Sequence, residues 1–408
     1  MLKTRLKVIL LYANYSSTTS YYEDWLDAFT FHDRFICHPL NILIKGAKTQ
    51  LKKNIDNVDL IILLHSTNAD DVGFISSYIN LLNSRKCKLL IFIGNEYNSP
   101  IYGARMLDKI NFMRRVSPEF IASQLPIDAA LKLYEDVKGA RILESPPALN
   151  PFYFKPIIDF RERSIDIGAR SYSYYPFLGD NERNAILDFF SKLKFSSSMK
   201  IDIETNTSKR LSRPDWARFL NNCKFTVSTE AGTYYLEKND LTVRKISRYL
   251  KAKLPLLNRL VLQLNESCLR NYIRRAVTTI HPKGISKVKA SLVDPNAIYY
   301  KIDFNEIYQM FFKNYKNPLS GKCISSRHFD AVGTKTCQIM FIGNFNGLLK
   351  PYENYIPVNR DFSNIQTVLS MMGDESTIKK IVNNTYEYVM DCHTYKHRVD
   401  RVFEVVCC

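Results

Sequence analysis

The sequence predicts an α/β protein built from two doubly wound domains, each a parallel sheet with helices on both faces. Short continuous apolar runs alternate with polar, helix-permissive segments, which is the pattern of βαβ units. The pattern occurs in two separate series without a sequence repeat, and a proline-rich segment lies between them. The length of 408 residues suits two or three domains.

The first series occupies residues 1–155, which we predict to form the first domain. Its strands are apolar runs that end in turn-forming residues, as buried parallel strands do; they lie at 6–13, 59–66 and 88–94. A helix is predicted at 21–31, and each strand is separated from the next by a segment long enough for a crossover. The first domain is therefore expected to contain a parallel sheet.

The second series begins after a connector at 145–156, which holds four prolines in twelve positions. Proline fixes φ and interrupts helices, so this connector is semi-rigid. We predict a second domain at 156–385 and a helical segment at 386–408. The predicted elements alternate as before, with strands at 164–169, 224–228 and 337–342 and helices at 181–193 and 376–392.

The composition excludes several classes of protein. Hydrophobic residues make up 46% of the chain and charged residues 24%, as in globular proteins and unlike disordered chains. No apolar run approaches the roughly 18 residues of a membrane span. The N-terminus enters the first strand without a separate apolar signal segment. We expect a cytoplasmic protein that does not span the membrane.

The cysteines and histidines give no sign of a disulfide framework or a metal centre. The nine cysteines are odd in number and include no C-x-x-C pair, and the seven histidines include no H-E-x-x-H. Paired, closely spaced ligands would be needed for either kind of site. Reduced thiols and no metal cofactor are therefore expected.

The net charge of +17 is concentrated in one region. Residues 241–289 hold twelve Lys and Arg and one acid, Glu266, within a predicted insertion at 241–303. This region contains two helical pieces with apolar faces, one on each side of Pro255. Basic amphipathic helices bind anionic lipid surfaces, basic patches also bind nucleic acid, and a solvated insertion is a third interpretation. Because no recognisable nucleic-acid-binding motif is present, we favour an anionic membrane surface and expect no nucleic acid partner.

Two doubly wound domains joined by a short linker leave a cleft between the carboxyl edges of their sheets, where nucleotides bind with their phosphates at a helix N-terminus. Neither G-x-G-x-x-G nor G-x-x-x-x-G-K-[ST] occurs, which argues against dinucleotide binding and P-loop hydrolysis. A predicted helix instead opens with Ser325, Ser326 and Arg327, and Asp330 lies one turn further. Ser326 and Arg327 suit a diphosphate and Asp330 suits a ribose diol; an ordinary capped surface helix is the alternative.

Four segments of the second half resemble a known family when taken together. They are R-H-F-D-A-x-G at 327–333, 350–358, 361–364 and H-T-Y-x-x-R at 393–398. They resemble the C-terminal domain of GT-B glycosyltransferases of group 1, in particular the spore-maturation (CgeB-like) branch, and the connector from Leu149 looks like the family's interdomain linker. The resemblance covers about 320–400, while residues 1–230 match only in architecture. It implies two Rossmann-like domains facing across a cleft and a nucleotide-sugar donor.

The resemblance also implies roles for individual residues. In related retaining enzymes, two glutamates separated by seven residues bracket the helix. Asp330 falls on the second, which implies a ribose-binding role, whereas the first falls on Lys322, a cation in place of a carboxylate. This departure leaves the donor sugar and the stereochemistry open, and it suggests a cation near the pyrophosphate.

Such transferases need no metal when fixed cations neutralise the departing nucleoside diphosphate. Arg170 and Arg327 are the first candidates, with Arg183 and Lys322 ranked after them. Further donor contacts are expected from the loop after the strand at 224–228, at Thr229, Glu230 and Gly232. A turn that simply requires glycine is the alternative interpretation of this loop.

An inverting mechanism would also need a base on the first domain. Glu96, His65 and Asp24 lie beyond predicted strand ends, and we rank Glu96 first; a retaining enzyme can dispense with such a base. Because the C-terminal helices of the family cross back to the first domain, we interpret the motif at 393–398 chiefly as a structural clasp.

The sequence therefore predicts a metal-independent GT-B glycosyltransferase that is cytoplasmic and peripheral to the inner face of the membrane. It would transfer a sugar to a saccharide or lipid-linked acceptor, in the synthesis of surface polysaccharide or lipopolysaccharide. A nucleotide-sugar epimerase of the same fold and a basic nucleic-acid-binding protein are the alternatives. The sugar, the acceptor and the stereochemical course stay open.

Overall fold

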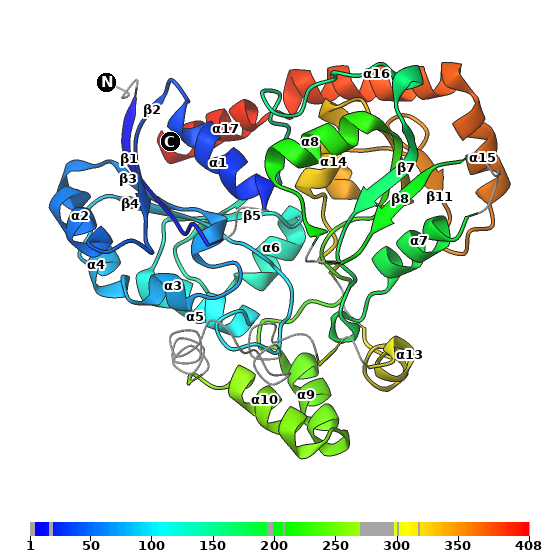
Figure 1. Cartoon of the computed structure of the whole chain (residues 1–408). Helices are drawn as coiled ribbons and strands as arrows, with labels where there is room; N and C mark the ends of the chain where they lie inside the picture. The colour runs from blue at the N-terminus through cyan, green and yellow to red at the C-terminus, as the bar shows by residue number, and fades with distance from the viewer. Residues whose placement is uncertain are drawn as a thin grey trace, which may run out of the picture.

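The computed structural model describes residues 5–15, 19–193, 199–206, 209–269, 298–299, 302–316 and 319–407. The part of the basic region at 270–289 lies outside the described residues. The chain forms two lobes, each a parallel sheet between layers of helices (Figure 1). The predicted α/β fold with two doubly wound sheets is confirmed.

The first sheet has six parallel strands in the order β2-β1-β3-β4-β5-β6. They span Phe35–Asn41, Leu6–Tyr12, Leu60–Leu63, Lys88–Phe92, Phe120–Ser123 and Arg141–Glu144. Successive side chains of a strand point to opposite faces, so Ile61 and Leu63 join one core while Leu60 and Ile62 join the other. The sheet is therefore buried on both sides, as the continuous apolar runs predict.

Helices cover both faces of this sheet. On one face lie α2 (Ala47–Asn54), α3 (Gly73–Ser76), α4 (Ile79–Asn83), α5 (Met106–Val116) and α6 (Ile127–Leu133). On the other face lie α1 (Ser20–Thr30) and the last helix of the chain, α17 (Tyr395–Cys407). The chain thus returns to the first lobe at its end, and Figure 1 shows α17 beside α1.

The second sheet has five parallel strands in the order β11-β10-β9-β7-β8. They span Ile356–Val358, Cys337–Phe341, Cys223–Ser228, Ile165–Arg170 and Ile201–Glu204. Helices α7 (Glu182–Ser191), α15 (Ile365–Gly373) and the first half of α16 (Glu375–Cys392) cover one face. Helices α8 (Arg213–Asn222) and α14 (Ser326–Gly333) cover the other, together with the connector. Helix α16 runs unbroken through 386, so the crossing to the first lobe starts after Cys392.

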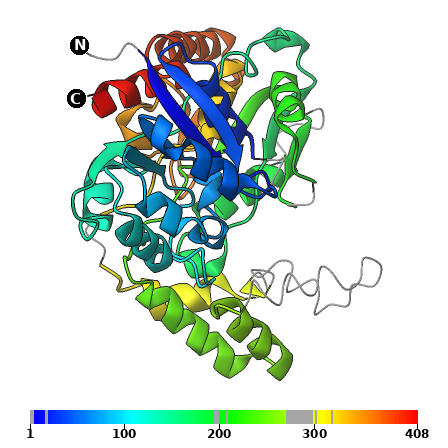
Figure 2. The ribbon, with the colours of Figure 1, turned by 90° about the vertical axis from the view of Figure 1, so that its left-hand side faces the viewer.

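The insertion forms an arm that projects from the lobes. Helices α9 (Leu241–Lys253) and α10 (Leu256–Glu266) make a hairpin, with the short α13 (Phe304–Ile307) nearby. Figures 1 and 2 show this hairpin below both lobes, with its turn pointing away from them. Among the described residues, no helix is both long and apolar enough to cross a membrane.

Candidate functional site

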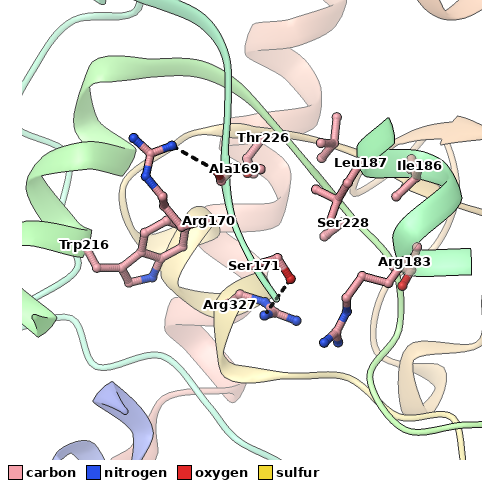
Figure 3. Close-up of a pocket in the computed structure, with 12 residues that line it drawn as sticks. Ala169, Arg170, Ser171, Arg183, Ile186, Leu187, Trp216, Thr226, Ser228 and Arg327 are labelled. Carbon is pink, nitrogen blue, oxygen red and sulfur yellow. Dashed lines mark hydrogen bonds between the residues drawn. The ribbon is translucent and has the colours of Figure 1, made fainter. Parts of the chain in front are cut away.

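A pocket lies at the carboxyl ends of β7 and β9, between the N-terminal ends of α7 and α14 (Figure 3). The strand order reverses between these two strands, because the chain goes from β7 to β8 on one side and then to β9 on the other. Such a switch point is where open α/β sheets bind ligands. The pocket is lined by Ala169, Arg170, Ser171, Arg183, Ile186, Leu187, Trp216, Thr226, Val227, Ser228, Thr229 and Arg327.

Two guanidinium groups converge in this pocket. Arg327, in the first turn of α14, donates from Nη1 to Ser171 Oγ at 3.3 Å. Arg183, in the first turn of α7, is 3% exposed, and its Cζ lies 3.9 Å from the ring centre of Tyr174. In Figure 3 the two guanidinium groups point toward the same space.

Neither guanidinium takes part in an ion pair of the described residues, and Nε and Nη1 of Arg183 have no hydrogen-bond partner among them. Burial, and then the charge of Arg183, lowers the pKa of Arg327 to about 10. Bringing two like charges together in a partly buried site is unfavourable unless an anion joins them. Each group also sits at a helix N-terminus, where backbone N–H groups attract anions. The arrangement therefore fits a bound phosphate group.

Arg170 faces away from this pair. Its guanidinium donates to the Asp202 carboxylate at 2.8 Å and to the Asp202 carbonyl at 2.9 Å, and it stacks on Phe219 at 3.9 Å. Figure 3 shows its guanidinium on the far side of Trp216 from Arg327. The sequence ranking of Arg170 above Arg183 is thus reversed by the geometry, since Arg183 is the one that meets Arg327.

Lys322 is likewise not a free cation for a pyrophosphate. Its buried Nζ forms ion pairs with Asp180 and, at 3.0 Å, with Glu182. Although burial opposes it, these two carboxylates raise the pKa of Lys322. The lysine therefore neutralises carboxylates at the start of α7, and its contact with a pyrophosphate stays a prediction.

The loop at 229–233 lies beside the pocket and pairs with the segment that leads into α14. Ala231 and Cys323 exchange backbone hydrogen bonds of 2.8 and 3.0 Å. Gly232 has a φ of +71°, and a Cβ there would lie 1.9 Å from the Gly321 carbonyl oxygen. The glycine is therefore required by the backbone. Thr229 lines the pocket, whereas the Glu230 carboxylate accepts the Phe345 N–H at 2.7 Å.

Helix α14 presents its N-terminus to the pocket. Ser325 caps the helix, and its N–H donates to His328 Nδ1 at 3.0 Å, which leaves Ser326 and Arg327 in the first turn. Asp330 is different, because its side chain is buried and accepts the Trp216 indole N–H at 2.9 Å. Burial raises the pKa of Asp330 well above its usual range. In this structure Asp330 lies behind Trp216 and is not open to a ribose.

Of the three base candidates, Glu96 is held by structural contacts. Its carboxylate accepts hydrogen bonds from Ser123 Oγ at 2.6 Å, Tyr134 Oη at 2.6 Å and the Gln124 N–H at 2.7 Å. Burial raises its pKa, which these bonds oppose. Glu96 therefore anchors the loop after β4 to the end of β5, and its side chain is buried.

Asp24 is part of a polar contact between the lobes. Its Oδ1 accepts from Asn150 of the connector at 2.7 Å and from Arg213 of α8 at 2.8 Å. Burial raises the pKa of Asp24 to about 6, although Arg213 opposes this. The residue fastens α1 to the second lobe, a role that the sequence did not suggest.

His65 lies just after β3 and is enclosed by Tyr21, Trp25 and Phe92. Neither ring nitrogen has a hydrogen-bond partner among the described residues, and burial lowers the pKa of His65 to about 3. The imidazole is therefore neutral at physiological pH. His65 therefore has unused acceptor capacity, as does Oδ2 of Asp24, but both side chains are buried.

The motif at 393–398 joins the end of the chain to the connector. His393 and Leu149 are linked by a backbone hydrogen bond of 2.9 Å, and Tyr395 returns one to Leu149 at 3.0 Å. Arg398 donates to the Pro146 carbonyl at 3.1 Å. These contacts give the motif the clasp geometry expected of it. In the part of the chain that is described, no group of three or more His, Cys, Asp or Glu side chains is arranged to hold a metal ion.

No family model matches this sequence, and no curated protein matches it. Among solved structures, HepE from Anabaena in complex with UDP and glucose is similar, at 7% identity and a TM-score of 0.55, over 98% of this chain and 99% of that chain. HepE in complex with UDP-glucose has 8% identity and a TM-score of 0.48, over 98% and 99%. Sucrose-phosphate synthase from Thermosynechococcus elongatus has 10% identity and a TM-score of 0.45, over 98% of each chain.

Identities this low show a shared fold and nothing finer, and of these three structures the complex of HepE with UDP and glucose has the highest TM-score. Its match extends over nearly the whole chain, including both sheets and the returning α17. The CgeB-like branch suggested by the sequence stays a prediction. The chain therefore has the GT-B fold, in which two Rossmann-like lobes face each other across a cleft.

Proposed function

We propose that this protein is a glycosyltransferase that takes its sugar from a nucleoside-diphosphate sugar bound at the pocket between β7 and β9. The observation that carries the proposal is the convergence of Arg183 and Arg327, two guanidinium groups without carboxylate partners at two helix N-termini. A diphosphate placed between them would remove their mutual repulsion. The crystallised complex of HepE with UDP and glucose supports a uridine nucleotide as the first donor to test.

The same pair supplies a chemical role in the reaction. When the bond between the sugar and the diphosphate breaks, negative charge develops on the departing phosphate oxygen. Fixed guanidinium groups stabilise that charge without having to reorganise. We therefore propose that transfer is metal-independent, with Arg183 and Arg327 in the place that a divalent cation takes in other transferases.

The acceptor is proposed to bind on the first lobe, as a saccharide or a lipid-linked saccharide of surface polysaccharide or lipopolysaccharide synthesis. No catalytic base is proposed on this side, because Glu96, His65 and Asp24 are all buried. The sugar can pass to the acceptor or to water. Excluding water from the cleft between the lobes favours transfer over hydrolysis.

Peripheral attachment to the inner face of the membrane is proposed through the arm. At the hairpin turn, Leu256 is 71% exposed and Leu257 is 51% exposed. The exposed cation Arg259 lies beside them, and so does the exposed Lys253, which is ion-paired with Glu306. Apolar side chains rimmed by cations fit an anionic lipid surface, where each cation contributes about 1 kcal/mol.

The test of the function begins with binding of UDP to the purified protein, followed by a screen of nucleotide sugars for nucleotide release. Incubation with donor alone, with the sugar product identified, separates a transferase from an epimerase. The proposal predicts UDP binding that Arg183→Gln and Arg327→Gln each weaken. Unchanged binding in both variants would place the donor elsewhere and contradict it.

A further inference from the structure

The two lobes meet a second time at the base of the arm, far from the connector. Asn98 of the first lobe pairs with the backbone of Glu237, donating from Nδ2 to the carbonyl at 2.6 Å and accepting the N–H at 2.7 Å. The Tyr102 N–H donates to the Asn265 carbonyl at 3.0 Å. Lys238 adds ion pairs to Glu135 and Asp136. Buried side-chain amides paired to backbone in this way fix one relative position of the two surfaces.

Asp240 is the centre of this contact. It is 0% exposed, and its carboxylate accepts the Leu107 N–H at 2.8 Å, the Met106 N–H at 3.3 Å and Asn98 Nδ2 at 2.7 Å. Met106 and Leu107 are the first two residues of α5, whose own N-cap position, Arg105, provides no side-chain cap. A helix of the first lobe therefore takes its capping carboxylate from the second lobe. Capping carboxylates satisfy free N–H groups and complement the helix dipole.

The backbone of Asp240 has φ +54° and ψ +31°, a left-handed conformation that is uncommon for residues other than glycine. Such a conformation persists only when surrounding contacts maintain it. The three hydrogen bonds to the first lobe are contacts of that kind.

The position of this contact relates it to the donor pocket. Asn98 directly follows the loop at 94–97, and Glu237 follows the pocket loop at 229–233 by a few residues. Tyr97 packs on the second-lobe cluster that contains Tyr174, the ring on which Arg183 stacks. The contact thus ties the loop after β4 in the first lobe to the loop after β9 in the second. Figure 1 shows α5 and α9, whose N-terminal ends this contact joins, on the side of the arm, and α17 on the other side of the first lobe.

We propose that Asp240 is a positioning residue, which latches the first lobe onto the second at the arm and so sets the distance between the acceptor side and the donor pocket. Its effect on transfer rests on the proposed function, whereas the latch itself does not. Nucleotide binding uses second-lobe residues only, so the latch affects transfer without affecting nucleotide affinity.

The test compares Asp240→Ala, Asn98→Ala and the double variant with the wild type. Asp374→Ala is the matched control, because Asp374 caps α16 through the Ser376 and Thr377 N–H groups within one lobe. For each protein we would measure hydrogen exchange at 94–107, the radius of gyration by small-angle scattering, the affinity for UDP and the transfer rate. Circular dichroism checks that each variant is folded.

We expect faster exchange at 94–107 and a larger radius of gyration in both single variants, with no such change in Asp374→Ala. The double variant adds little to either, since both side chains serve one contact. The transfer rate falls at least tenfold, while the dissociation constant for UDP changes less than about twofold.

Unchanged hydrogen exchange and an unchanged radius of gyration would overturn the latch. Loss of UDP affinity in parallel with transfer would show a general structural role and overturn the positioning role. Absence of UDP binding in the wild type would instead contradict the proposed function, and the exchange and scattering results would still decide the latch.

Discussion

We expect Arg327 to lower the folding stability of the unliganded protein and to increase its affinity for UDP. The fall in the pKa of Arg327 from its ordinary value to about 10 corresponds to about 3 kcal/mol of unfavourable environment for the charged guanidinium. Because the side chain is half-buried, solvent screens part of this, and we take about 1–2 kcal/mol as the cost. Replacing Arg327 with Gln should therefore raise the thermal midpoint of the unliganded protein by a few degrees, at roughly 2–4 °C per kcal/mol for a domain of this size.

The same substitution should weaken UDP binding. Hydrogen bonds to charged groups contribute about 1.5–3 kcal/mol, so loss of one guanidinium raises the dissociation constant roughly 10- to 150-fold. Differential scanning fluorimetry with and without UDP, and isothermal titration calorimetry, measure both effects. Arg218→Gln is the matched control, because Arg218 is a solvent-exposed arginine of α8 paired with Asp215. A variant that is less stable than the wild type and binds UDP equally well would show that Arg327 is a structural arginine and not a phosphate ligand.

Three further outcomes are expected. Asp24 has a pKa raised by burial to about 6 from 3.8, so the stability that its protonated form provides is present below about pH 4 and is lost as the pH rises through 6. The difference in thermal midpoint, Asp24→Asn minus wild type, should therefore increase between pH 4 and 7, by the equivalent of at most about 3 kcal/mol. Parallel pH profiles of the two proteins would contradict this. Leu256→Ser with Leu257→Ser should reduce sedimentation with phosphatidylglycerol vesicles severalfold and leave UDP affinity unchanged, whereas equal sedimentation would remove the arm from the membrane contact. Transfer should persist in excess EDTA, and a loss that Mg²⁺ restores would show that the guanidinium pair is not sufficient.

The fold was predictable because the signal is carried by local pattern. Runs such as 59–66 and 88–94 contain strands that are almost completely buried, and burial on both faces of a parallel sheet demands continuous apolar sequence. The edge strand β2 was missed because its pattern, Phe35 to Asn41, is mixed, with one proline and several exposed side chains. Its place in the sheet is set by pairing with β1, which no local pattern reports.

The site was predictable only in part. The N-terminus of α14 was found from its serines and arginine, and the topology then placed it at the switch point. Arg183 could have been ranked higher, since the first helix after β7 also points its N-terminus at that switch point. The partner of Arg170, Asp202, and the partners of Lys322 come from other elements, and such pairings depend on side-chain direction that sequence spacing does not encode.

The base candidates illustrate the same limit. Glu96 and His65 follow strand ends, as a catalytic side chain would, whereas Asp24 lies within helix α1. Glu96 nevertheless accepts from three donors, and Oδ1 of Asp24 accepts from two, while Oδ2 of Asp24 has no hydrogen-bond partner among the described residues. Whether a carboxylate is occupied depends on tertiary neighbours such as Tyr134 and Arg213, which lie far from it in the sequence. A polar residue at a strand end therefore indicates a position near the cleft, but not a role.

A crystal of the protein soaked with UDP would show directly whether the donor binds at the arginine pair. We expect diphosphate density between the guanidinium groups of Arg183 and Arg327, at the N-termini of α7 and α14. Density for UDP at any other place on the molecule, with these two side chains unchanged and uncontacted, would contradict it.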